Sequence, residues 1–162
     1  MIRIIPIMLL NNLLFGEIPK IGEKAPDFLL NDQDNTIHRL VDYTGKRLII
    51  YFFPKANTPG WIKQACGLRD ESENFEKYNI AILGVSYDTK SVLKSFKENH
   101  KLNFNLLSDS EKIMGKDYGV NRFNLFPSRK TFLIDEDGIL VHVLNSVNLN
   151  THPKDILDFF KQ

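Results

Sequence analysis

The stretch RLIIYFFPKANTPGWIKQACGLRD, residues 47–70, joins an apolar run to a loop and then to the start of a helix. The run RLIIYFF (47–53) is nearly continuous in apolar, β-branched and aromatic residues, which is typical of a strand buried on both faces of a sheet. Pro54 ends the run, and Thr58-Pro59-Gly60 precedes the helix. We therefore expect the loop at the carboxyl end of a buried strand, where α/β proteins place their ligands.

Strand and helix signals alternate through the rest of the chain. Further strands are expected at 24–32, 80–88 and 104–109, and a hairpin over 129–144 turns at Asp135-Glu136-Asp137-Gly138. Helices are expected over 61–78, 89–100, 111–118 and 150–162. This order predicts an α/β chain with a thioredoxin-like fold. Its central mixed sheet should be mostly parallel, with helices on both faces and antiparallel edge strands from the hairpin.

The composition is that of one globular domain without strong bias. The 162 residues carry a formal net charge of +1, which gives no global attraction to nucleic acid or to acidic membranes. A single cysteine cannot form an internal disulfide, and no spacing of Cys and His indicates zinc. The histidines are expected to be polar residues of the surface or of a strand face: His38, His100, His142 and His152.

The N-terminus divides into an extension, residues 1–18, and the domain, residues 19–162. MIRIIPIMLLNNLLFG (1–16) has Arg3 before a short apolar run and Gly16 at its end, which resembles a signal peptide. The Asn11-Asn12 pair interrupts the run, and a true start at Met8 is an alternative. The run is too short to span a bilayer as a helix, which needs about 20 apolar residues. We expect a cytoplasmic protein without stable membrane association, with export as the alternative.

The loop before the helix has the surroundings of a reactive cysteine. Helix N-termini carry a partial positive charge, and a thiol there has a lowered pKa and is partly thiolate at neutral pH. Thr58 can form a hydrogen bond beside such a group, and Arg129, at the start of the predicted hairpin, can complete an anion-friendly pocket. The residue at the junction is nevertheless Trp61, and the only cysteine, Cys66, lies five positions later.

The stretch resembles a known family motif. The pattern Pro-x-x-x-Thr-x-x-Cys marks the peroxiredoxins, and here it reads PKANTPGW (54–61). The chain is similar to the bacterioferritin comigratory protein or peroxiredoxin Q branch of the AhpC/TSA superfamily from about Gly22 to Gln162, through GEKAPDF, LLSD, YGV and RKTFLIDEDG. The resemblance implies thioredoxin-dependent reduction of hydrogen peroxide and organic hydroperoxides, without metal, haem or flavin. It also implies that the protein is a monomer.

The resemblance assigns a role to each motif position. Thr58 and Arg129 match the pair that holds the peroxide oxygens, and Pro54 matches the residue that shields the site. Cys66 matches the resolving cysteine, which forms a disulfide that thioredoxin or a similar dithiol reduces. Trp61 stands at the peroxidatic position. Because indole has no thiolate and offers only a weak N–H donor, we expect peroxidase activity to be lost or weak.

Several interpretations remain open. The chain is a naturally inactive peroxiredoxin, or Cys66 acts alone as an atypical thiol peroxidase. Alternatively, Trp61 reflects a sequencing error or an engineered change in an ordinary peroxidase. A different class is a non-catalytic module that binds a redox partner. Structural roles are also open: Trp61 as a core aromatic, Thr58 as a helix cap, Arg129 as a surface ion-pair partner and Cys66 as a small buried hydrophobe.

Overall fold

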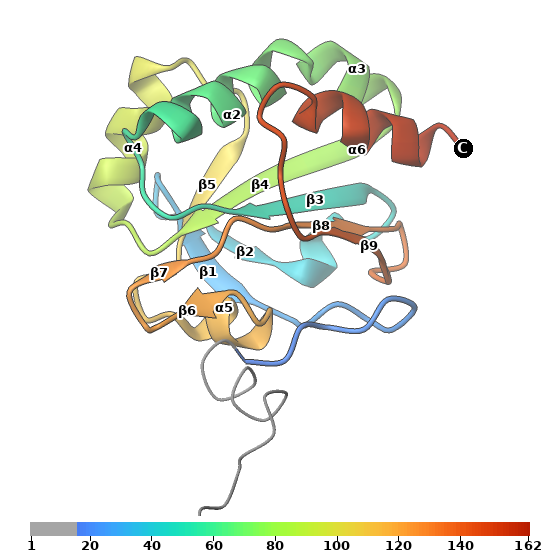
Figure 1. The fold of residues 1–162 in the computed structure, drawn as a ribbon, viewed down its shortest axis with the longest axis horizontal. Coiled ribbons are helices and arrows are strands. Elements are labelled where there is room, and N and C mark those ends of the chain that lie inside the picture. The colour runs from blue at the N-terminus through green and yellow to red at the C-terminus, as the bar shows by residue number, and fades with distance from the viewer. Residues whose placement is uncertain (1–15) are drawn as a thin grey trace, which may run out of the picture.

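The computed structural model describes residues 16–162, and a seven-stranded sheet forms its centre. The strands of this sheet are β1 (Leu29–Asp32), β2 (Ile37–Arg39), β3 (Arg47–Phe52), β4 (Ile80–Ser86), β5 (Asn105–Ser108), β8 (Thr131–Ile134) and β9 (Leu140–Leu144). They are hydrogen-bonded in the order β2-β1-β5-β4-β3-β8-β9 (Figure 1). The apolar run at 47–53 therefore forms an interior strand, β3, as predicted.

The sheet is mixed. β3 pairs in parallel with β4, and β4 with β5, whereas the pairings of β8, β9, β1 and β2 are antiparallel. The predicted mixed sheet is confirmed, but the expectation that it is mostly parallel is wrong. After β1 the chain reverses, because Asp32 accepts hydrogen bonds from the amides of Asp34 and Thr36, and Asn35 takes a φ of 65°. This turn joins β1 to β2 in an antiparallel hairpin, of which only the first strand was expected.

Strand β3 lacks a polar face because both of its faces are buried. Its side chains alternate between two hydrophobic cores, as the pleat of a strand requires. Ile49, Tyr51 and the following Phe53 enter one core, and Leu48, Ile50 and Phe52 enter the other. None of these six side chains is more than 1% exposed, so the run is fixed in position by packing on both sides.

Helices cover both faces of the sheet, as predicted. They are α2 (Pro59–Asp70), α3 (Ser72–Lys77), α4 (Lys90–Asn99), α5 (Ile113–Asp117) and α6 (His152–Phe160). Residues of α2, α3, α4 and α6 belong to the core that contains Tyr51, and α5 contributes Met114 to the core that contains Phe52. The single helix expected over 61–78 is wrong. The chain forms two helices that meet at Glu71, whose ψ of 11° departs from helical geometry.

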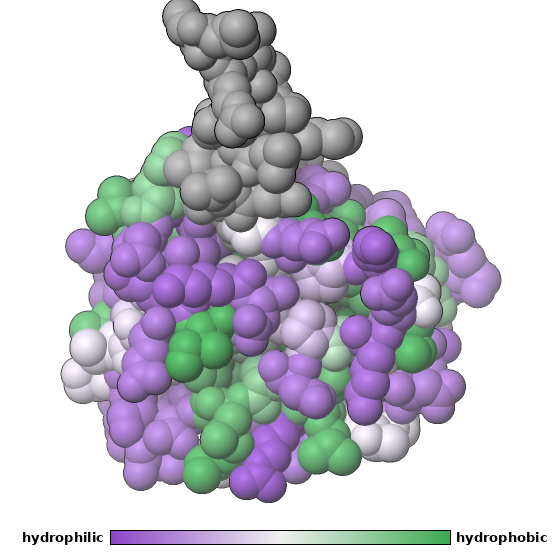
Figure 2. Space-filling model, turned by 90° about the horizontal axis from the view of Figure 1, so that it is seen from below, coloured by the Kyte–Doolittle hydropathy of each residue, from purple (hydrophilic) through white to green (hydrophobic). Residues whose placement is uncertain are grey.

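Smaller elements lie outside the sequence expectations. A 3-10 helix, η1 (Leu40–Tyr43), follows β2, and β6 (Asn121–Arg122) pairs with β7 (Phe126–Pro127) in a separate two-stranded ribbon. The ribbon and α5 lie below the sheet in Figure 1. Figure 2 views that side and shows apolar side chains scattered among polar ones.

Within residues 16–162, none of the helices has the length and apolar character needed to cross a bilayer. The signal-like run expected at the N-terminus lies outside the described residues.

Candidate functional site

The loop between β3 and α2 is held by local hydrogen bonds. The Ala56 amide donates to Oδ2 of Asp88 over 2.8 Å, and Asp88 follows β4, the parallel neighbour of β3. The Thr58 hydroxyl donates to the Lys55 carbonyl over 3.2 Å. Thr58 occupies the position just before α2, but its side chain makes no capping hydrogen bond. Pro54, partly buried, opens this loop directly after the buried run.

Trp61 lies in the first turn of α2 and points into the core. Its side chain is 0% exposed, and its ring lies 4.2 Å from the ring of Phe53 and 5.7 Å from that of Tyr51, measured between centroids. The indole Nε1 is buried and has no hydrogen-bond partner among residues 16–162. Trp61 is therefore a packed core aromatic, and its polar atom is left unsatisfied.

Arg129 lies against the face of the same indole. Its guanidinium carbon is 5.2 Å from the Trp61 ring centroid, which is the geometry of a cation–π contact. A Cβ added to Gly60 would lie 3.1 Å from Nη2 of Arg129, so the guanidinium also packs on the start of α2. Burial lowers the pKa of Arg129 from its ordinary value. The structure thus brings together Arg129, Trp61 and the first turn of α2.

Cys66 lies on the same helix but further along it. It is five residues after Trp61, which corresponds to about 7.5 Å along the helix axis. The side chain is partly exposed and its thiol is free. Next to it, Gly67 packs on Pro153 of α6, since a Cβ there would lie 3.5 Å from the proline ring. Cys66 is therefore on the part of α2 that neighbours α6, beyond the first turn where the helix dipole acts strongly.

Comparison with known proteins shows the family of the chain. The sequence model of the AhpC/TSA family matches residues 21–143. The chain belongs to the AhpC/TSA family. It is 39% identical to "Peroxiredoxin Bcp" of Escherichia coli (strain K12) over 150 residues, which cover 88% of this chain and 96% of that protein. It is 37% identical to "Peroxiredoxin Q, chloroplastic" of Oryza sativa subsp. japonica over 138 residues, covering 84% of this chain and 63% of the rice protein.

Solved structures agree with the family assignment. The crystal structure of peroxidoxin BcpB from Mycobacterium tuberculosis has a TM-score of 0.83 and 30% identity, covering 90% of this chain and 97% of that one. A structure of peroxiredoxin Q from Xanthomonas campestris has a TM-score of 0.78 and 28% identity, covering 83% of this chain and 89% of that one. The thioredoxin-like fold and the resemblance to the Bcp/PrxQ peroxiredoxins are confirmed.

Next to the Trp61 site of this peroxiredoxin lies a buried histidine that the sequence did not indicate. His152 is 1% exposed; its Nδ1 pairs with Nε2 of Gln64 over 3.1 Å and its Nε2 pairs with the Thr131 hydroxyl over 2.9 Å. Burial lowers the pKa of His152 to about 4, and the charge of Arg129 lowers it further, against an opposing effect of Asp155. The expectation of a surface or strand-face histidine is wrong here, because tertiary packing of α6 on α2 buries the ring.

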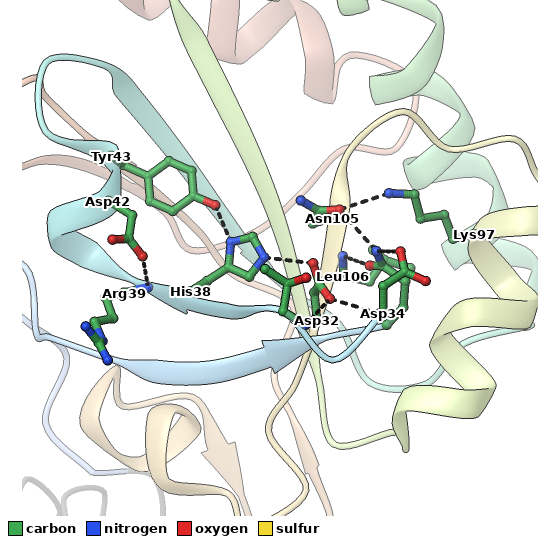
Figure 3. Close-up of polar contacts among 11 residues, drawn as sticks. Asp32, Asp34, His38, Arg39, Asp42, Tyr43, Lys97, Asn105 and Leu106 are labelled. Atoms are coloured by element: carbon green, nitrogen blue, oxygen red, sulfur yellow. Dashed lines mark hydrogen bonds and ion pairs between the residues drawn. The ribbon is translucent and has the colours of Figure 1, made fainter.

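A second polar cluster lies at the opposite edge of the sheet from β8 and β9 (Figure 3). His38 Nε2 is 2.8 Å from Oδ2 of Asp32, and His38 Nδ1 is 2.7 Å from the Tyr43 hydroxyl. Asp32 and His38 are only 3% and 9% exposed. The cluster links β1, β2 and η1, so His38 is the expected polar residue of a strand face, here buried by its two partners.

Proposed function

We propose that this chain is a peroxiredoxin of the Bcp/PrxQ type whose family reaction is lost or weak because Trp61 stands at the peroxidatic position. The family reaction is the reduction of hydrogen peroxide and organic hydroperoxides, with electrons from thioredoxin or a similar dithiol. The proposal carries the roles of Thr58, Arg129 and Pro54 over from the family motif. Of these three, Arg129 lies against an indole in place of a thiolate.

The observation that carries the proposal is the contact between Arg129 and Trp61. In the family reaction, a thiolate attacks one peroxide oxygen while cationic and N–H donors hold both oxygens. Here the guanidinium lies 5.2 Å from the centre of a fully buried indole ring. An indole ring is far bulkier than a thiol and has no ionisable group in the physiological range. The side chain therefore occupies the volume beside Arg129 and offers no nucleophile there.

A second candidate function rests on Cys66. Its side chain is partly exposed, so a peroxide in solution can reach it, unlike a fully buried thiol. Against this candidate, Cys66 is about two turns into α2, where the helix dipole gives little help. Its thiolate would also lie away from the first turn, on which Arg129 packs. We therefore expect Cys66 to react with hydrogen peroxide no faster than an ordinary thiol.

The substitution Trp61→Cys tests the proposal directly. It should give thioredoxin-dependent consumption of hydrogen peroxide, because it restores a thiol at a helix N-terminus beside Arg129. Trp61→Ser is the matched control, since it opens a similar space without sulfur and should remain inactive. Both variants lose a large core side chain, at about 3–5 kcal/mol of stability, so far-UV circular dichroism must first show that they are folded.

The outcomes separate the two candidates. Activity in Trp61→Cys alone supports the proposal that this position decides the chemistry. Equal activity in the native chain and in Trp61→Ser, abolished by Cys66→Ser, would instead establish the Cys66 candidate. A folded Trp61→Cys variant without activity would show that the pocket has changed beyond this one position.

A further inference from the structure

A groove of about 740 Å³ lies along the β1–β2 hairpin and is formed by residues other than those of the Trp61 site. Its walls come from the hairpin, from α5 and from the loop that joins β5 to α5. Leu29 and Ile37 line it on the hairpin side and Ile113 on the α5 side, and these side chains are 62%, 52% and 56% exposed. A single exposed apolar side chain is ordinary, but three along one groove indicate a surface that another segment covers.

Acidic side chains without partners surround this groove. Asp27, Glu111 and Asp117 line it, and their carboxylates make no hydrogen bond or ion pair with any residue in the range 16–162. The only base among its described lining residues is Lys90, whose ammonium donates to the side chain of Asn35. The groove therefore favours an occupant that combines apolar side chains with a positive charge.

The described part of the chain begins beside the same helix. A Cβ added to Gly16 would lie 2.6 Å from the Lys116 carbonyl oxygen, and one added to Gly119 would lie 2.7 Å from the Glu17 carbonyl carbon. The chain thus packs on the C-terminal end of α5 as it enters the domain. Asp117, at that end of α5, lines the groove. Because α5 has five residues and is about 7.5 Å long, the chain start and the groove are close neighbours.

The sequence that precedes this point has the properties that the groove favours. Residues 1–15 read MIRIIPIMLLNNLLF, which is mostly isoleucine, leucine and methionine, with Arg3 as the only charged side chain. An apolar run of this kind is unfavourable in water unless another surface covers it. Fifteen residues span up to about 50 Å when extended, so the whole groove is within their reach.

We propose that this groove binds the N-terminal segment of the same chain, residues 2–10, IRIIPIMLL. The apolar side chains on one side of the segment cover Leu29, Ile37 and Ile113, and Arg3 supplies the positive charge that the acidic rim lacks. Residues 11–15 then connect the docked segment to the end of α5. The inference goes beyond the proposed function, because it uses no residue of the Trp61 site.

Hydrogen exchange of the full chain, followed by mass spectrometry, tests the docking. Amides of a docked segment are shielded from solvent, so residues 2–10 should exchange about ten-fold or more slowly than an unstructured peptide of the same sequence. Protection of β3 and β4 is the internal control that each sample is folded. The native chain is measured at high and at low protein concentration, because docking within one chain does not depend on concentration.

A double groove variant and a segment variant test the contacts. Leu29→Gln combined with Ile113→Gln should reduce the protection of residues 2–10 about ten-fold, because it removes two apolar side chains of the groove. Arg3→Glu should also reduce it, because the acidic rim then repels the segment. Leu125→Gln is the matched control: Leu125 is 70% exposed between β6 and β7, outside the groove, and its loss should leave the protection unchanged. The replaced leucine and isoleucine side chains are all exposed, so each variant should keep its fold.

Loss of protection in both test variants, with Leu125→Gln unchanged, supports the proposal. It is overturned if residues 2–10 of the native chain exchange like an unstructured peptide, or if either test variant keeps the native protection. Protection that disappears at low protein concentration would place the segment in the groove of a second copy, and would also overturn it. None of these results depends on peroxide turnover, so they are separate from the test of the proposed function.

Discussion

Two buried polar atoms near the Trp61 ring have no hydrogen-bond partner among residues 16–162, the indole Nε1 and the Tyr51 hydroxyl. Tyr51 lies on β3 with its ring 5.7 Å from the indole, and its hydroxyl is buried without a hydrogen-bond partner among the described residues. Burial raises the pKa of this hydroxyl well above its ordinary value, with a smaller contribution from Cys66. The hydroxyl therefore carries a desolvation cost that no contact in the described chain offsets.

Tyr51→Phe should for this reason be neutral or stabilising, by up to about 1–2 kcal/mol in the free energy of unfolding. Tyr118→Phe is the matched comparison, because that ring is equally buried but its hydroxyl donates to the Pro26 carbonyl over 2.8 Å. Tyr118→Phe should destabilise by about 1 kcal/mol. Urea denaturation of both variants measures the difference. A clear loss of stability in Tyr51→Phe would show that its hydroxyl has a partner.

His152 should make the stability of the protein fall as the pH is lowered. Its pKa in the folded state is about 4, below the ordinary value of 6.5, because burial disfavours the charged ring. Between these two values the unfolded chain binds more protons than the folded chain, so protons favour unfolding. The contribution is full above about pH 6.5 and is lost as the pH falls toward 4, by roughly 3 kcal/mol. His152→Gln should reduce this slope, which urea denaturation at several pH values measures.

Asp109 gives the opposite dependence and serves as the control. Burial raises the pKa of its carboxyl to about 6, although the amides of Gly115 and Met114 donate to it and oppose the shift. Between about pH 4 and 6 the folded chain binds more protons at this site, so acidification is stabilising. The stability difference between native protein and Asp109→Asn should therefore change with pH in the opposite direction to that of His152→Gln. Equal slopes in both comparisons would contradict the two assignments.

At the scale of elements, the hairpin of β1 and β2 is fixed by a chain of polar side chains. It forms one edge of the sheet, and edge strands of three or four residues have few backbone hydrogen bonds to hold them. His38 bridges the Asp32 carboxylate and the Tyr43 hydroxyl, and so joins β1, β2 and η1 (Figure 3). Hydrogen bonds to a charged group contribute more to stability than neutral ones. The buried hydrogen bonds of His38 therefore stabilise an edge hairpin that has few backbone hydrogen bonds.

His38→Ala should destabilise the protein by about 1–3 kcal/mol, because it leaves the buried Asp32 carboxylate without its imidazole partner. The loss should appear first as faster amide hydrogen exchange in β1 and β2 than in β3. His142→Ala offers a comparison on the opposite edge, since that ring is only partly buried and stacks on Phe159. Equal amide exchange rates in β1 and β2 of the two variants would show that the His38 hydrogen bonds do not stabilise this hairpin.

At the scale of the whole molecule, the sequence predicted the elements whose burial is strong and continuous. The run at 47–53 had to be an interior strand, since no polar face was available, and its two faces defined the two cores. The alternation of strands and helices then gave the thioredoxin-like arrangement. The short pieces could not be predicted: β6 and β7 have two residues each, and the break at Glu71 lies within an uninterrupted helical pattern.

The site was predictable where the motif is local and not where it depends on tertiary packing. Thr58 and Trp61 are fixed by the loop and the helix start that follow β3. Arg129 was expected nearby because it opens the predicted hairpin. In the structure the first hairpin strand, β8, pairs with β3, and the Arg129 guanidinium lies over the indole. The burial of His152 depends on α6 packing against α2, a contact between residues 88 positions apart that no local pattern encodes.

Under the proposed function, an indole occupies the peroxidatic position of this peroxiredoxin, and the native chain has no fast peroxide chemistry. The most direct test is the rate at which the native protein loses its single free thiol, Cys66, when mixed with hydrogen peroxide in a stopped-flow instrument. We expect a rate no higher than that of an ordinary low-molecular-weight thiol at the same pH. Consumption of Cys66 many-fold faster than that reference would contradict it.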